Sequence, residues 1–456
     1  LADAGATLAG LSAADIGGLA AKGIDRIDAT DNVLTLSVAQ YLALGTVTLP
    51  AADTVTLADT GVTLAGLSAA NMSGLVAKGV DRLDSLDSVL TLSVAQYLAL
   101  GTVALTAADT VMLADTGATL TGLSAADIGG LAAKGVDGID VTDNALTLSV
   151  AQYLALGTVT LTAADTVTLA DTGSNLAALT AAQIGALAGK GIDRIDAIND
   201  ALTLSVAKYQ ALGVVALTSG DLVTLADAGA TLAGLSAADI GGLAAKGVDR
   251  LDCTNNVLSL SVAQFQALGA VTLTATDTVT LADTGATVAG LSSADIGGLA
   301  AKGIDKIDAT DNVLTLSVAQ YLALGTVTLT AADTVTLADT GATLTGLTVA
   351  QITALTGNGI DRIDATDNVL TLSAAQHLAL GSVTLTAADV VTLADTGANL
   401  AALSAAQFGA LAGKGIDSID ATDNVLSLNL ARYNALGTVL LTATDNVTLA
   451  DTGANL

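Results

Sequence analysis

The feature that most constrains this chain is an internal repeat of 56 residues. A fixed period of this size indicates a repeat architecture, in which each unit buries its apolar face against the next. We therefore expect one uninterrupted array over residues 1–456, made of eight repeats and the start of a ninth, as a fragment of a longer protein. The string LADTG, or its variant LADAG, marks the starts at Leu1, Leu57, Leu113, Leu169, Leu225, Leu281, Leu337, Leu393 and Leu449.

Each repeat contains two related halves, as the first repeat shows. Residues 11–36 read LSAADIGGLAAKGIDRIDATDNVLTL, and residues 36–57 read LSVAQYLALGTVTLPAADTVTL. Both halves begin with Leu-Ser and continue as a short helical segment that reaches Gly23 or Gly45. Apolar pieces on either side of an Asp-containing corner follow, so the two halves predict two similar structural units.

The helices are predicted from their end signals. Ser12 and Ser37 are each followed by Asp or Gln three residues later, which is the pattern of a capping box. Gly23 and Gly45 stand where a left-handed residue ends a helix. Helices this short are marginal in isolation, so packing must hold them.

The segments after each helix predict strands. Val47–Leu49 and Val55–Leu57 alternate apolar residues with Thr, and the residues between them, like Asp28–Asn32, have turn chemistry. Each half then reads helix–strand–corner–strand, and stacking such half-coils gives parallel sheets. A β-hairpin at each Asp corner is the alternative. We expect an α/β tandem-repeat solenoid, elongated and curved or twisted because helices need more room than strands.

The composition excludes several functions. The formal net charge is −29, and all 44 acidic residues are Asp. This charge argues against nucleic acid and anionic membranes as partners. No run of about 18 apolar residues predicts a transmembrane segment. Self-association or surface attachment is the expected kind of partnership, with no small-molecule substrate.

Recurring carboxylates form the candidate metal site. Asp25, Asp28 and Asp53 return in all eight repeats, and Asp31 and Asn32 complete the first corner. Calcium prefers six to eight oxygen ligands, so these residues and their equivalents are candidate calcium ligands, with no other cofactor expected. The alternative is that they only form hydrogen bonds in turns. The chain lacks both the EF-hand loop and the calcium β-roll nonapeptide.

Nothing in the sequence predicts an enzyme. His377 is the only His, and it occupies a slot that holds Tyr or Phe in the other repeats. Cys253 is the only Cys, in a slot of small residues. Both are expected to fill space, because neither has a recurring partner for nucleophilic catalysis.

Threonines suggest a further alternative. Thr46, Thr48, Thr54 and Thr56 would form outward rows if the coils stack, as in ice-binding β-solenoids. Several repeats interrupt these rows with Ala, Val, Leu or Met. Thr is also an ordinary outward-facing strand residue, so ice binding is the weaker alternative.

The repeat resembles arrays in very large secreted or surface proteins of alphaproteobacteria, described as adhesin-like or calcium-binding repeat proteins. Residues 307–341, IDATDNVLTLSVAQYLALGTVTLTAADTVTLADTG, carry the resemblance, which extends over the whole chain. It implies an extracellular or cell-surface location. The leading expectation is a structural protein that forms a stalk, filament or surface lattice, and a calcium-dependent adhesion module is the first alternative.

Overall fold

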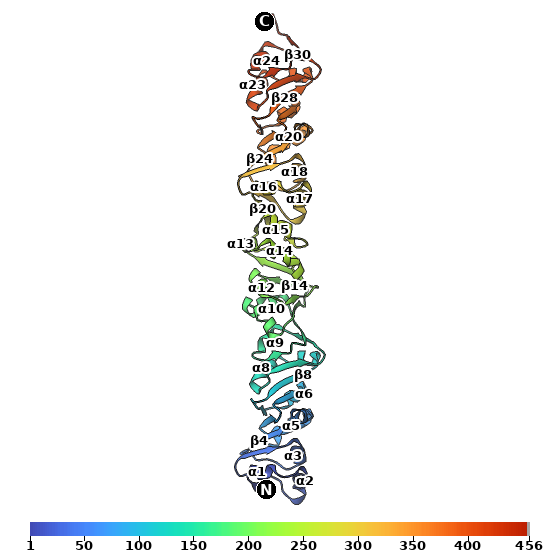
Figure 1. Ribbon diagram of the computed structural model, residues 1–456, viewed down its shortest axis with the longest axis vertical. Coiled ribbons are helices and arrows are strands. Elements are labelled where there is room, and N and C mark those ends of the chain that lie inside the picture. Colours follow the sequence, from blue (N-terminus) through green and yellow to red (C-terminus); the bar gives the residue numbers. More distant parts are fainter. Residues whose placement is uncertain (454–456) are drawn as a thin grey trace. The chain divides into compact units, whose positions relative to one another are not determined.

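The computed structural model describes residues 1–453 and divides into two compact units, Leu1–Leu225 and Ala226–Leu456. Within each unit the same helices and parallel strands recur every 56 residues (Figure 1). The expected α/β tandem-repeat solenoid is thereby confirmed. Among residues 1–453, no helix has the length and apolar character needed to cross a membrane.

The third repeat illustrates the order of the elements. The second and seventh repeats differ from it, because one longer helix, α5 (Ala69–Ala77) or α20 (Val349–Gly357), replaces the second α-helix and the 3-10 helix. Two helical stretches precede a pair of strands, and a third helix precedes the next pair. The elements are α7 (Gly117–Thr121), α8 (Ala125–Gly130), the 3-10 helix η2 (Ala132–Lys134), β9 (Gly138–Val141), β10 (Ala145–Leu148), α9 (Val150–Ala155), β11 (Thr160–Leu161) and β12 (Thr166–Asp171).

The two predicted helices and their ends are confirmed. Ser124 caps α8 and Ser149 caps α9, each within a complete capping box. Gly135, after η2, has φ 91°, and Gly157, after α9, has φ 56°. These are left-handed conformations, which Gly adopts without the cost that a Cβ brings.

A third helix per repeat, α7, was not predicted. It arises from the GATLT segment, and Thr116 caps it by accepting a hydrogen bond from the Thr119 N–H at 3.4 Å. Each repeat therefore contains this helix in addition to the two that were expected. Five residues are too few for an amphipathic pattern to show, so the helix depends on packing against the next coil.

The Asp corners join strands of one coil and do not form hairpins. In the sheet of β10, β12, β13 (Arg194–Ala197) and β15 (Ala216–Leu217), every pairing is parallel and links different half-coils. The coil arrangement is thus confirmed, and the hairpin alternative is wrong.

The sheets have four strands each, apart from the two-stranded sheets at the first and last described repeats. The first four residues of β12 pair with β10 and its last four pair with β13, so successive strands slide along one another. The outward row across the sheet is Thr147, Thr168, Arg194 and Ala216. A continuous sheet with unbroken Thr rows, as expected for ice binding, is not formed.

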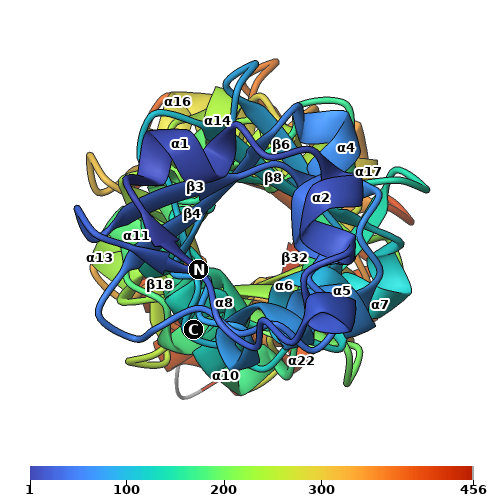
Figure 2. The ribbon, with the colours of Figure 1, turned by 90° about the horizontal axis from the view of Figure 1, so that it is seen from below.

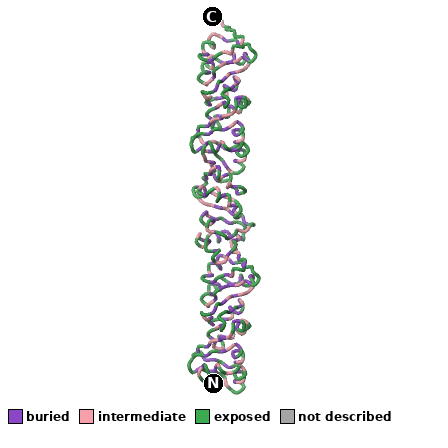
Figure 3. The backbone as a smooth tube through the Cα atoms, in the orientation of Figure 1, coloured by how far each residue is buried: buried purple, intermediate pink, exposed green. Residues whose placement is uncertain are grey.

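Aliphatic side chains fill each coil. Leu120, Ile128, Leu131, Ile139 and Leu146 are almost completely buried, and buried residues recur through each coil in Figure 3. In the first repeat, α1 (Gly5–Ala9) packs against β3 (Val33–Leu36), while α2 (Ala13–Gly17) lies on a different side of the coil (Figure 2). Thin layers of Leu, Ile and Val therefore form most of the core, and aromatic rings such as Tyr153 and Phe408 are few but buried.

Gly117 marks a very close approach between coils. A Cβ at this position would lie 1.8 Å from the carbonyl oxygen of Ala145, and real Cβ atoms essentially never come within 3.0 Å of another atom. Every LADTG glycine for which α7-type packing is described has the same contact, at 1.7–1.9 Å. The glycine of this motif is therefore required by packing, whereas its φ is ordinary.

Candidate functional site

The predicted calcium ligands lie at the contacts between successive coils. In the third repeat, the residues equivalent to Asp25, Asp28, Asp31, Asn32 and Asp53 are Asp137, Asp140, Asp143, Asn144 and Asp165. Three of these five accept hydrogen bonds from main-chain N–H groups 24 to 26 residues earlier. Each is described in turn.

The Asp25-type carboxylate adds a hydrogen bond to the contact between strands of successive coils. Asp137 Oδ2 accepts from the Val111 N–H at 2.8 Å, and the Asp137 N–H donates to the Val111 carbonyl at 2.9 Å. Its main chain and side chain together satisfy both polar groups of Val111. Buried main-chain groups without partners are costly, so this carboxylate stabilises the contact between coils.

The Asp31-type residue caps the unpredicted helix. Asp143 Oδ1 accepts from the N–H of Gly117, the first residue of α7, at 2.8 Å. In the next two repeats Asn199 and Asn255 accept the equivalent bond at 2.7 and 3.0 Å. An amide oxygen therefore serves as well as a carboxylate, which explains why the sequence tolerates Asn here.

The Asn32-type residue is a conformational requirement. Asn144 has φ 58°, and its counterparts in the other repeats lie between 54° and 58°. Asn, Asp and Ser fill this position, and Asn is the commonest of them. Asn tolerates the left-handed region better than most residues with a Cβ, so its backbone angle explains its recurrence.

The Asp28-type and Asp53-type residues meet through one hydroxyl. Thr162 Oγ1 donates toward Asp140 Oδ1 at 3.1 Å and also lies within hydrogen-bonding distance of Asp165 Oδ2. The same triad recurs in repeats two to eight, and Pro50 replaces the Thr in the first repeat. These are the two predicted ligands that the fold brings together.

The Asp53-type carboxylate is the most enclosed. Asp165 is 6% exposed, and its Oδ2 also accepts from the Val141 N–H at 3.0 Å. Its Oδ1 is buried and has no hydrogen-bond partner, as in Asp53, Asp277, Asp333, Asp389 and Asp445. A buried oxygen of this kind calls for a partner that protein groups do not supply.

The fit to a metal ion is limited by these contacts. Within residues 1–453, no three carboxylate, His or Cys side chains gather into a group that could hold a metal ion. The Asp25-type and Asp31-type oxygens bond to main-chain N–H groups, so the five predicted ligands do not form one corner. The Asp–Thr–Asp triad offers fewer oxygens than the six to eight that calcium prefers.

The LADTG aspartate, which is Asp3 in the first repeat and was expected only as a possible addition to the calcium corner, is a further residue of this kind. Asp171 Oδ2 accepts from the N–H of Val150, the first residue of α9, at 3.1 Å. Burial opposes ionisation of Asp171, but hydrogen bonds from Asn175, Thr172 and Val150 outweigh it and lower its pKa. Its recurrence in every LADTG or LADAG string was the available signal.

A glutamine inside the second capping box also joins two coils. Gln152 Oε1 accepts from the Ser149 N–H at 2.8 Å, which completes the box. Its Nε2 donates to the carbonyls of Thr121 and Leu123 at 2.9 and 2.7 Å, at the end of α7. One side chain thus caps the start of α9 and the end of a helix in the preceding half-coil.

His377 behaves as the predicted space-filling ring. It is 6% exposed, and burial, together with the charge of Lys414, lowers its pKa. Its Nδ1 has no hydrogen-bond partner. A buried, neutral imidazole at a position that holds Tyr or Phe in the other repeats is consistent with a side chain that fills space in the core.

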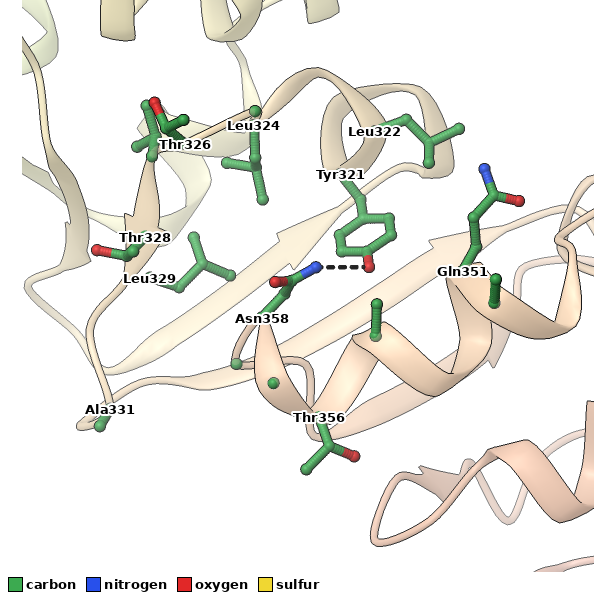
Figure 4. Close-up of a pocket in the computed structure, with 16 residues that line it drawn as sticks. Tyr321, Leu322, Leu324, Thr326, Thr328, Leu329, Ala331, Gln351, Thr356 and Asn358 are labelled. Atoms are coloured by element: carbon green, nitrogen blue, oxygen red, sulfur yellow. Dashed lines mark hydrogen bonds between the residues drawn. The ribbon is translucent and has the colours of Figure 1, made fainter.

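A cavity of about 630 Å³ lies between the sixth and seventh repeats (Figure 4). It lies between the end of α18 (Val318–Ala323) and α20 (Val349–Gly357). Tyr321 and Asn358 line it, and Asn358 Nδ2 donates to the Tyr321 hydroxyl at 2.9 Å. At the position of Asn358 all the other repeats have Lys, so this cavity distinguishes one repeat from the rest.

The sequence matches no protein-family model, and no curated protein matches it significantly.

Proposed function

We propose that this chain is a structural repeat array of a secreted or cell-surface protein, where it forms a stalk, a filament or a surface lattice. The observation that carries the proposal is the use of the recurring aspartates. Each repeat uses them to bond main-chain groups of the preceding coil, as Asp137, Asp143, Asp165 and Asp171 do. The recurrence of these residues is explained by their role in joining each coil to the one before it.

The array suits mechanical continuity. Within each unit the coils use both of their sides, as parallel strands and side-chain bonds join the third repeat to the coils before and after it. Stability in such arrays is a sum of repeat and nearest-neighbour terms, so length can grow without a new core. The acidic surface, with a net charge of −29, keeps such a structure soluble.

Electron microscopy of the native protein, with immunogold labelling of intact cells, tests this proposal. We expect label at the cell surface or in extracellular filaments, and repeating features along the labelled structure. Label confined to the cell interior, on dispersed particles, would contradict both the location and the structural role. Sedimentation velocity of the purified chain over a range of concentrations tests self-association separately.

A calcium-dependent adhesion or binding module is the second candidate. The observation that favours it is the buried, unpartnered Oδ1 of Asp165, beside a hydroxyl shared with Asp140. A cation held by Asp140, Thr162 and Asp165, with water completing its shell, would give that oxygen a partner. Such binding would raise stability by mass action.

Thermal unfolding with excess calcium and with a chelator tests the second candidate. If calcium binds at the triads, the melting temperature rises with calcium, and Asp165→Asn reduces the shift. Asp143→Asn is the matched control, because Asn199 and Asn255 already form the equivalent bond. Superimposable curves for the unmodified chain would leave the aspartates with their structural role alone.

A further inference from the structure

A lysine at the end of the second helical stretch packs against the preceding half-coil in most repeats. Lys78 Nζ donates to the Gly45 carbonyl at 2.8 Å, and Lys190 and Lys414 make the equivalent bonds to Gly157 and Gly381. This ammonium therefore has a defined acceptor, the carbonyl of the glycine that follows the α3-type helix (α3, Val38–Ala43).

An aromatic ring lies beside the same ammonium. Lys78 Nζ lies 5.5 Å from the centre of the Tyr41 ring, and Lys134 Nζ lies 4.8 Å from that of Tyr97. A cation within about 6 Å of a ring face is attracted to it. The fold thus provides a repeated ammonium site made of a ring, a carbonyl and apolar walls.

The seventh repeat keeps this site but lacks the lysine. Asn358 stands in place of the lysine and bonds to the Tyr321 hydroxyl at 2.9 Å, and Gly325 is the counterpart of Gly45. In two other repeats that hydroxyl donates to a main-chain carbonyl, as Tyr153 does to Gln183 at 2.9 Å. Tyr321, which Figure 4 labels, and Gly325 both line the cavity.

The cavity is larger here than at the equivalent position that carries a lysine. It measures about 630 Å³, whereas the cavity beside Phe265 and Lys302 in the preceding repeat measures about 260 Å³. Leu324, Leu329 and Ala354 contribute apolar walls. These walls suit the methylene groups of an alkyl chain, since long amphipathic side chains bury their stems and leave the charged end polar.

We propose that this cavity binds a primary alkylammonium group, with its alkyl chain along the apolar walls and its ammonium at the Gly325 carbonyl and the Tyr321 ring. The ligand replaces the lysine that the other repeats carry. The site does not need a carboxylate. In the fourth repeat the neutral Gln183 occupies the position of Gln351, and Lys190 still bonds to the Gly157 carbonyl. A free aliphatic amine and a lysine side chain of another polypeptide both present this group.

Saturation-transfer NMR on the full chain with n-butylammonium tests the proposal, at a salt concentration that screens the acidic surface. We expect binding to the unmodified chain and at least a tenfold weaker signal for Asn358→Lys, whose own side chain fills the site. The matched variant Lys190→Asn should gain a second site, because Tyr153, Gln183 and Gly157 reproduce the residues around Asn358. n-Butanol, which has the same alkyl chain without the charge, should bind at least tenfold more weakly.

The source of the ammonium is distinguished by a second pair of probes. A short peptide with one unmodified lysine, and the same peptide with that lysine acetylated, show whether a polypeptide side chain can enter. Loss of binding on acetylation would identify a lysine side chain as an accepted ligand, and binding of n-butylammonium alone would restrict the site to free amines.

Two results would overturn the proposal. One is an n-butylammonium signal that Asn358→Lys leaves within twofold and that Lys190→Asn does not increase, since the amine would then bind the acidic surface in general. The other is equal binding of n-butanol, which would make the cavity merely apolar. Circular dichroism of each variant confirms that the fold is retained, and the gain expected for Lys190→Asn does not depend on the folding of Asn358→Lys.

Discussion

Replacement of Gly117 by Ala should disrupt the contact between two coils. The new Cβ would lie 1.8 Å from the Ala145 carbonyl oxygen, so the two main chains must separate by about 1 Å or more. That movement also stretches the 2.8 Å bond from the Gly117 N–H to Asp143. Overpacking costs about 1–3 kcal/mol and loss of a hydrogen bond to a charged group about 1.5–3 kcal/mol. We expect a total of about 3–5 kcal/mol.

Hydrogen–deuterium exchange with mass spectrometry is the suitable assay, because unfolding of a long array need not be two-state. A loss of about 3 kcal/mol corresponds to an increase in local opening of more than a hundredfold. We expect that increase in peptides covering α7 and β10, with smaller effects in coils farther along the chain.

Gly129→Ala is the control within the same repeat. A Cβ at Gly129 would lie 3.8 Å from the Ala155 Cβ, which is an ordinary contact, and the helix should gain about 0.5–1 kcal/mol. The two Gly→Ala substitutions should therefore change the free energy of unfolding in opposite directions. Equal exchange rates for Gly117→Ala and the unmodified chain would refute the close packing of α7 against the next coil.

Three further predictions concern single side chains in the third repeat. Asp143→Asn should change the free energy of unfolding by less than about 0.5 kcal/mol, whereas Asp143→Ala should cost about 1–2 kcal/mol, as measured by the same exchange assay. Asn144→Gly should be nearly neutral and Asn144→Val should cost at least about 1–2 kcal/mol in that assay, because residue 144 has φ 58°. Hydrogen bonds from the Ser124 side chain and main chain lower the pKa of Asp127 below its ordinary 3.8. The stability that this pair contributes is therefore present above pH 3.8. It is lost as the pH falls through the lower pKa of the folded state. Ser124→Ala should raise the pKa of Asp127 and weaken this acid dependence, and NMR titration of the Asp127 carboxyl checks the shift.

The positions of the candidate ligands could be read from the sequence, but their bonding could not. Asp165 and Asp143 both recur at corners, yet one is buried beside Thr162 and the other caps α7. The assignment requires knowing which residues of the preceding coil lie opposite. For Asp143 the opposite residue is Gly117, the first residue of the unpredicted α7.

The sequence alone determined the period, the α/β class, the two capped helices and the glycines that end them. These follow from short-range relations, such as Ser124 with Asp127 three residues later, which are complete within a few residues. Only the tertiary structure decided that α7 is a helix, that Gly117 must lack a side chain and that Asp143 bonds 26 residues back along the chain. These features arise where one coil lies against the next. Their partners are set by the parallel register between coils, which no local pattern of residues specifies.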